Sequence, residues 1–149
     1  MSHHLLLIIH LLAATIWVGG HLVLLFGILP GVMRTRNQNT LLDFERKYEP
    51  VGLTAMALSI ITGIMLSYKY GVTASQWFHF ANPIENVVSI KLLLLFTTVL
   101  FALSAQIRVL PKLKHSNKKL PEMAVHIFCV SMLGVSMLIV GSFVRFGGV

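Results

Sequence analysis

The chain has 149 residues, of which 56% are hydrophobic and only 11% are charged, with a formal net charge of +7. A soluble domain normally carries about 25% charged residues, so this composition excludes an ordinary soluble enzyme or binding module. The positive charge does not indicate nucleic-acid binding, because no basic stretch is interleaved with aromatic residues. The single cysteine, Cys129, excludes disulfides and thiolate clusters within the chain, and its apolar surroundings indicate a buried side chain.

Four apolar segments are long enough to cross a membrane, and they cover about 5–29, 51–68, 87–107 and 123–144. About 20 apolar residues span the hydrocarbon layer as a helix. The segments lack the alternation of barrel strands, and only helices or closed barrels satisfy their backbone groups in lipid. The first segment has no basic n-region and is too long for a cleavable signal, so we expect a mature helix. The sequence therefore predicts an all-α integral membrane four-helix bundle that forms one domain, residues 1–149.

Lysine and arginine residues set the expected orientation. Nine of the twelve lie in the loop between the first two segments and the loop between the last two. The opposite side carries only Lys69, Lys91 and Arg145. Because cytoplasmic loops carry an excess of basic residues, we expect both termini on the non-cytoplasmic side of a bacterial inner membrane.

Local signals refine the helices. Thr40 to Asp43 reads as a capping box, so we expect the second helix to begin there, ahead of its apolar segment, with a kink at Pro50. Small residues that let helices approach closely, and that favour a homodimer, recur in the second and fourth segments. They are Gly52, Ser59, Gly63, Gly134 and Gly141.

Two histidines, His10 and His21, are the only titratable groups within the first apolar segment. Eleven helical residues advance the chain ~16 Å and return it to within ~20° of the same face. An ionisable side chain inside a membrane costs ~2.5–3.5 kcal/mol or more and usually faces the protein interior. Either both rings donate hydrogen bonds to nearby carbonyls and only pack, or at least one of them binds a metal or haem.

Four further residues are candidates for the same chemistry. His126 lies near the cytoplasmic end of the fourth helix, at a depth closer to His21 than to His10. His79 lies among aromatic residues in the outer loop, where an ordinary interfacial ring is the alternative. Lys91 and Arg145 lie near the outer face. They either anchor at the headgroups or hold an anionic group, such as a haem propionate or a quinone.

A b-type haem needs axial imidazoles from facing helices, small residues beside the ring and cations near its propionates. His21 with His126 meets the two-helix requirement, and His10 with His79 forms a second, weaker pair. All five acidic residues lie in or beside loops, so we expect neither hydrolytic chemistry nor proton pumping. We therefore expect a haem b protein that transfers electrons within the membrane, and oxidoreductase is the enzyme class left open.

The N-terminal sequence offers a separate argument for copper. Removing Met1 would leave Ser2, His3 and His4, with histidine in the third position, and an unblocked Met1 also gives histidine in the third position. A free amine, two amides and that imidazole make a square-planar nitrogen site that suits Cu(II) or Ni(II), although so short a motif also arises by chance. A copper-transport protein would bind copper at this site at its mouth, and it would bind copper through histidines or methionines within the bundle. The internal candidates are His10, His21, His126, Met56 and Met137.

Two stretches resemble a known family. The run from His10 to Gly20 resembles the first-helix signature of the copper-resistance protein D (CopD) family. The run from Phe44 to Leu53, together with Thr62-Gly63, is similar to the region after that signature in the same family, and the resemblance extends over all four helices. It implies copper handling in the inner membrane.

The chain is also similar to the HemJ-type protoporphyrinogen oxidases. That family has a first-helix histidine that matches His10 and a third-helix lysine that matches Lys91. The similarity implies haem b binding, with oxidase activity as a further alternative. Ser89 stands where that family usually has a histidine two residues before the lysine.

Overall fold

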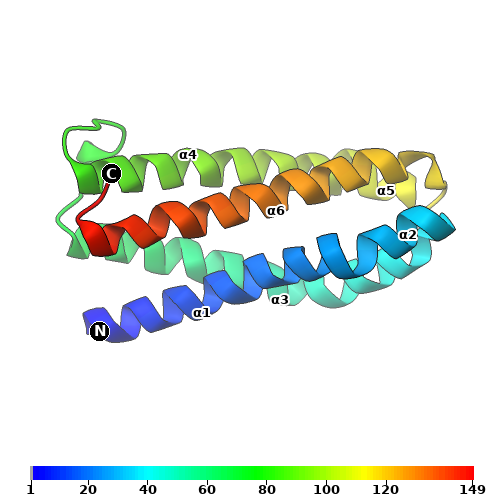
Figure 1. Cartoon of the computed structure of the whole chain (residues 1–149), viewed down its shortest axis with the longest axis horizontal. Helices are drawn as coiled ribbons and strands as arrows, with labels where there is room; N and C mark the ends of the chain where they lie inside the picture. The colour runs from blue at the N-terminus through cyan, green and yellow to red at the C-terminus, as the bar shows by residue number, and fades with distance from the viewer. Residues whose placement is uncertain (1) are drawn as a thin grey trace.

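The computed structural model describes residues 2–149, and the regular structure of these residues is entirely helical. Four rods run the length of the molecule (Figure 1), and each is long and apolar enough to cross a membrane. They cover His3–Thr35, Gln38–Lys69, Pro83–Leu113 and Asn117–Phe146. The prediction of an all-α protein with four membrane-length helices is confirmed.

Several rods combine more than one helical element. The first consists of α1 (His3–Leu22), a π-helical segment (Val23–Ile28) and α2 (Leu29–Thr35), and the second is α3 (Gln38–Lys69). The third consists of α4 (Pro83–Ser104), a π-helical segment (Ala105–Val109) and α5 (Leu110–Leu113). The fourth is α6 (Leu120–Ser142), with a short 3-10 turn at each end, Asn117–Lys119 and Phe143–Phe146. Another 3-10 turn, Ala74–Gln76, lies in the loop after α3.

Both π-helical segments directly precede a Leu-Pro pair, Leu29-Pro30 in the first rod and Leu110-Pro111 in the third. A proline has no N–H to donate, and its ring clashes with the carbonyl four residues earlier. A single wider turn before the proline lets the rod continue past that clash. Such π-helical turns are frequent at functional sites.

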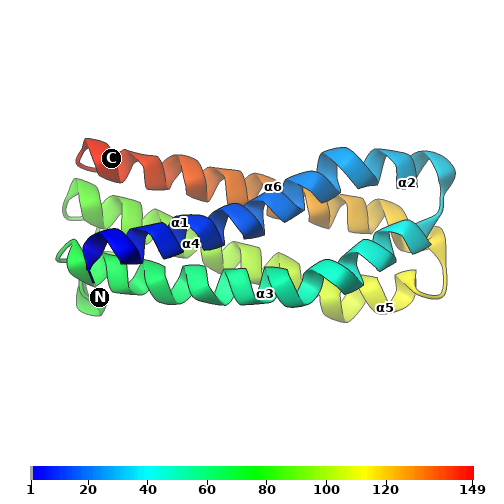
Figure 2. The same ribbon diagram turned by 90° about the horizontal axis from the view of Figure 1, so that it is seen from below.

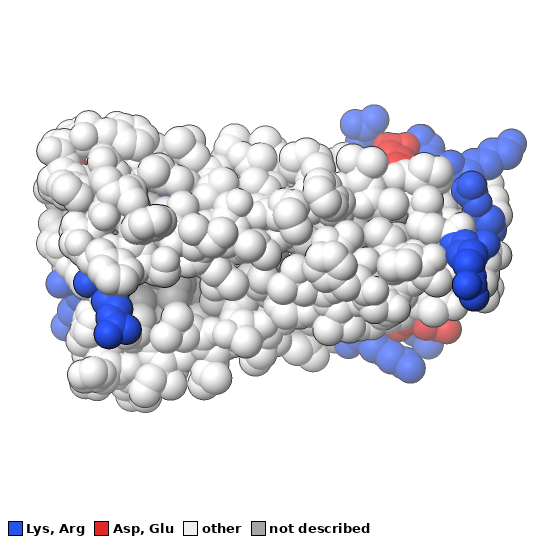
Figure 3. Space-filling model, in the orientation of Figure 1, with Lys and Arg blue, Asp and Glu red and all other residues white. Residues whose placement is uncertain are grey.

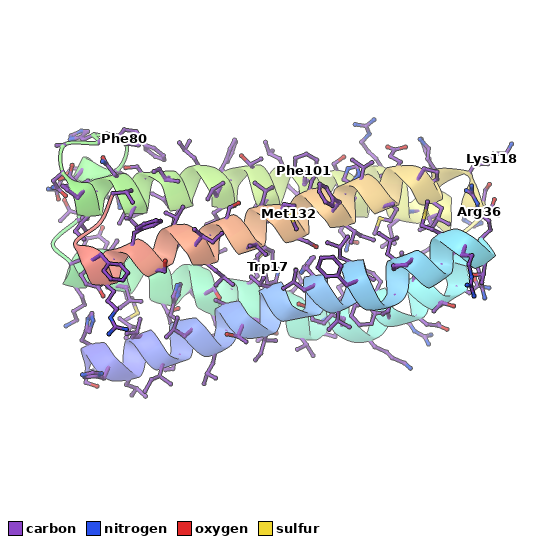
Figure 4. The ribbon with its side chains drawn as sticks, viewed as in Figure 1. Trp17, Arg36, Phe80, Phe101, Lys118 and Met132 are labelled. Atoms are coloured by element: carbon purple, nitrogen blue, oxygen red, sulfur yellow. The ribbon has the colours of Figure 1, made fainter. Side chains whose placement is uncertain are left out.

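The rods form two antiparallel pairs, α1 with α3 and α4 with α6, and contacts between α1 and α6 join the pairs (Figures 1 and 2). Both termini lie at one end of the bundle, which we call the terminal end. The opposite end holds the two connections 36–37 and 114–116, and we call it the basic end. Most Lys and Arg side chains gather there in Figure 3. Figure 4 places Arg36 and Lys118 at the basic end and Phe80 at the terminal end.

The start of α3 differs from the prediction. Arg36 adopts a left-handed conformation with φ 55° and ends α2. Asn37 then caps α3, because its side-chain oxygen accepts the N–H of Asn39 at 3.2 Å. Thr40 therefore lies inside the first turn, and the predicted capping box is wrong as a helix start. The helix does begin ahead of the apolar segment, continues through Pro50 and bends along its length (Figure 2).

Buried apolar side chains concentrate toward the basic end. The larger cluster includes Leu24, Leu29, Leu41, Val109, Leu113, Leu120 and Met123. A smaller cluster surrounds Trp17, near the middle of the bundle (Figure 4). Large apolar side chains such as Phe26, Phe96 and Ile107 are exposed on the outside of the rods, which is the surface that lipid covers in a membrane protein.

The glycines on which the dimer prediction rests lie opposite side chains of the same chain. A Cβ atom at Gly134 would lie 3.2 Å from Trp17, one at Gly63 would lie 3.1 Å from His10, and one at Gly141 would lie 3.1 Å from Lys91. Packing within one chain therefore explains why these positions are small. The homodimer stays a prediction that these glycines do not support.

Tyr48 of α3 fills a slot against α1. Its hydroxyl donates to the carbonyl oxygens of Trp17 at 2.8 Å and Ile16 at 3.1 Å. A Cβ atom at Gly20 would overlap Cζ of this ring, and one at Gly52 would lie 2.8 Å from Cε1. The ring is therefore confined on two sides, and it fits only because both positions are glycine.

We expect the substitution Gly20→Ala to destabilise the pairing of α1 with α3, because Tyr48 cannot move away without losing its hydrogen bonds. Overpacking of this kind costs about 1–3 kcal/mol. The matched control is Gly19→Ala, because a Cβ atom at Gly19 has no neighbour within 4 Å. Thermal unfolding in detergent, followed by circular dichroism, should show a lower midpoint for Gly20→Ala alone. Equal midpoints for the two variants would contradict the packing argument.

Candidate functional site

Two cavities lie inside the bundle, one in each half. The basic-end cavity has a volume of about 120 Å³ and is lined from α1, α3, α6 and the third rod. The terminal-end cavity has a volume of about 360 Å³ and lies toward the termini. Trp17 and Met56 line both cavities, so the two spaces meet near the middle of the bundle.

His21 of α1 and His126 of α6 line the basic-end cavity together. In each ring, Nδ1 lies 2.9 Å from the carbonyl oxygen of the residue four positions earlier, Trp17 or Glu122. A carbonyl oxygen only accepts, so this network assigns the ring hydrogen to Nδ1 in both histidines. Each Nε2 therefore carries the lone pair, which is the tautomer that a metal-ligating imidazole needs.

The two Nε2 atoms differ in their surroundings. Nε2 of His126 accepts a hydrogen bond from the hydroxyl of Ser104 at 3.1 Å. Within residues 2–149, Nε2 of His21 has no hydrogen-bond partner, and the ring packs beside Trp17 and Tyr48. His21 is therefore free to bind a ligand as it stands, whereas His126 must first exchange its bond to Ser104.

The wall from α3 contains residues that the sequence analysis missed. These are Glu45, Tyr48 and Glu49, which line the basic-end cavity beside Gly52, and Glu45 accepts a hydrogen bond from Gln106 at 3.2 Å. All acidic residues were expected in or beside loops, but α3 begins well before its apolar segment. The spacing of Glu45, Glu49, Gly52 and Met56 is the signal that places them on one helical face.

His10 of α1 and Lys91 of α4 line the terminal-end cavity. Nδ1 of His10 lies 2.9 Å from the Thr62 hydroxyl, which itself donates to the carbonyl of Leu58 at 2.6 Å. His10 therefore donates through Nδ1, and its Nε2 also carries the lone pair. Lys91 lies over Gly141 of α6, where a Cβ atom would come within 3.1 Å of Nζ.

The remaining candidates lie apart from these cavities. His79 and Arg145 are exposed at the terminal end and line neither space, so His10 and His79 do not share a cavity. His3 lies in the first turn of α1, with its Nε2 3.4 Å from the hydroxyl of Tyr70, and His4 is exposed. Met1, which belongs to the predicted copper motif, is outside the described residues. Among residues 2–149, no three His, Cys, Asp or Glu side chains form a group suited to a metal ion.

A ring of hydrogen bonds around Glu85 holds the loop 70–82 over the terminal-end cavity. The buried carboxylate accepts from the N–H of Ala81 at 3.1 Å and from the amides of Asn82 and Gln76 at 2.8 and 3.2 Å. Asn82 in turn caps α4, because its side-chain oxygen accepts the N–H of Glu85 at 2.9 Å. This ring positions Trp77, which lines the cavity.

The chain matches no family model, no curated protein and no solved structure in the comparisons made with each. The similarities to the CopD and HemJ-type families therefore stay predictions that rest on the quoted residues. His10 and Lys91, the two HemJ-type matches, line one cavity. Ser89 stands at the position of that family's additional histidine. It is fully buried, and its hydroxyl accepts the N–H of Phe78, so it helps to hold the loop 70–82.

We expect Glu85→Ala to loosen the loop 70–82, because three donors lose their buried acceptor at a cost of about 1–3 kcal/mol. Hydrogen exchange followed by mass spectrometry should show about tenfold faster exchange in peptides covering this loop. The control is Asp43→Ala, which removes an exposed carboxylate whose only ion pair, to Arg46, spans 3.8 Å. Unchanged exchange in Glu85→Ala would show that the ring does not hold the loop.

Proposed function

We propose that this chain is a multi-pass membrane protein that binds haem b in the basic-end cavity, with His21 and His126 as axial ligands, and transfers electrons within the membrane. One observation carries the proposal. Imidazoles from two different helices line one cavity, and both have their Nδ1–H groups held by backbone carbonyls. Bound haem would supply the one-electron chemistry.

The residues fit this group in chemistry. A carbonyl that accepts from Nδ1 fixes the ring orientation and raises the basicity of Nε2. Ala102 and Ala105 also line the cavity and present little bulk to a flat ring. The volume of about 120 Å³ is below the ~300–1,000 Å³ of typical ligand pockets, so the walls must move apart on binding. The π-helical segment at Ala105 lies in one of these walls.

We place the chain in a bacterial inner membrane, and the arrangement of charges supports an orientation with both termini on the non-cytoplasmic side. Lys and Arg side chains concentrate at the basic end, which this proposal places in the cytoplasm (Figure 3). Lys91 lines the other cavity and Arg145 lines neither, so we do not assign them to the haem.

We expect the purified protein to show the sharp reduced α and β bands of a six-coordinate b-type haem after dithionite reduction. His21→Ala and His126→Ala should each lose most of the bound haem, because each removes one axial ligand. The control is His115→Ala, which changes an exposed histidine outside both cavities. Haem content unchanged in both ligand variants, or a colourless wild-type protein, would refute the proposal.

Copper binding is a second candidate, and a line of soft ligands favours it. Met137 and His10 line the terminal-end cavity, Met56 lies at the junction, and His21, Met123 and His126 line the basic-end cavity. Thioether and imidazole groups suit Cu(I). The line runs through the interior of the bundle, as a transport path would.

If copper moves along this line, Met56→Leu should slow Cu(I) uptake into vesicles about tenfold, because it removes the thioether at the junction with little change in volume. Met65→Leu is the matched control, since Met65 is 41% exposed and lines neither cavity. Uptake that persists without haem and depends on Met56 would favour copper over haem. Equal uptake by the two variants would remove this candidate.

A further inference from the structure

We propose that the terminal-end cavity binds a long-chain acyl carboxylate, with its acid group at Lys91 and its chain among the aliphatic walls. This cavity is separate from the proposed haem site, and the proposal does not depend on haem. It rests on the size of the cavity, an unpaired cation and two buried polar groups that lack partners.

The size and walls of the cavity suit an apolar molecule. Its volume of about 360 Å³ lies within the ~300–1,000 Å³ of typical ligand pockets. Aliphatic side chains from three of the rods make up much of the lining. They include Leu7, Leu11, Ile60, Leu92 and Leu95.

Lys91 supplies a positive charge without a protein counter-charge. The described residues contain two ion pairs, Asp43 with Arg46 and Lys119 with Glu122, and both lie toward the basic end. No aspartate or glutamate lines the terminal-end cavity. A lysine that only anchored the helix would extend to the surface, but Lys91 lies over Gly141 and lines the cavity. An anionic ligand group would supply the missing partner.

Two more polar groups point to the same ligand chemistry. Nε1 of Trp77 and the hydroxyl of Ser59 are buried without a hydrogen-bond partner, and both residues line the cavity. Leaving such a group unpaired costs about 1–3 kcal/mol. The indole N–H and the ammonium of Lys91 can only donate, and a hydroxyl can donate as well.

This donor set selects among ligand head groups. A carboxylate only accepts, and its two oxygens offer about four lone-pair sites, enough for several donors at once. An amine would leave Lys91 opposed by a like charge, and an alcohol would leave that charge uncompensated. A carboxylate at the end of an apolar chain therefore matches the charge of Lys91 and the aliphatic walls.

The test uses fluorescence of the full-length protein in detergent. Both tryptophans of the chain, Trp17 and Trp77, line the cavity, so a brominated fatty acid bound there should quench them. We expect saturable quenching by dibromostearic acid and at least tenfold weaker binding of its methyl ester, which lacks the charge. Lys91→Met should weaken binding of the acid at least tenfold, and Lys91→Arg should largely restore it. Lys69→Met, which removes an exposed cation at the same end, should bind like wild type.

Equal binding of acid and ester by the wild-type protein would overturn the proposal without any variant. Equal affinity of Lys91→Met and Lys69→Met for the acid would also overturn it, provided that circular dichroism shows both variants to be folded. A third arm uses brominated phosphatidylglycerol, whose phosphate offers the same charge. Lys91-dependent quenching by this lipid, without quenching by the fatty acid, would assign the cavity to a phospholipid instead. Because the readout does not involve haem, failure here and failure of the haem proposal are distinguishable.

Discussion

The carbonyl oxygen of Trp17 accepts hydrogen bonds from two side chains, the hydroxyl of Tyr48 at 2.8 Å and Nδ1 of His21 at 2.9 Å. The first bond ties α1 to α3, and the second fixes the tautomer and direction of an imidazole in the basic-end cavity. Helices in lipid gain little from hydrophobic burial against each other, so close packing and such polar contacts determine how they pair. Gly20 and Gly52 allow the contact by leaving space for the Tyr48 ring. The same backbone atom therefore connects the fold to the candidate site.

Packing is distributed unevenly along the bundle. The larger apolar cluster fills the basic half, where the two π-helical segments and the prolines that follow them also lie. The terminal half instead contains the larger cavity, and the hydrogen bonds to Glu85 and those of the C-terminus lie at this end of the bundle. The N–H of Val149 donates to the carbonyl of Pro83, and the carbonyl oxygen of Val149 accepts from the side-chain amide of Asn86. A densely packed half thus supports a half with space for a ligand.

The sequence was sufficient to predict the rods, because long apolar runs determine membrane helices almost alone. Helical rise also placed His21 and His126 at similar depth, and both now line one cavity. Glu45 and Glu49 were not predicted as cavity residues, because hydropathy indicates only where the apolar segment begins. The helix α3 itself begins well before that point, so it carries both side chains. The separation of Lys91 and Arg145 could not be predicted either. It depends on which way each side chain points around its helix, and uniformly apolar segments give little information about rotation.

The glycines opposite His10 and Lys91 have a consequence for ligand orientation. His10 precedes Pro30 by 20 positions, and Lys91 precedes Pro111 by the same number. Each faces a glycine of the following rod, Gly63 or Gly141. The two pairs of rods thus place corresponding residues beside one cavity, with different chemistry at the corresponding positions. An imidazole occupies one side and an ammonium the other. A molecule with unlike ends therefore meets different chemistry beside the two glycines, so its two ends are not interchangeable within the cavity.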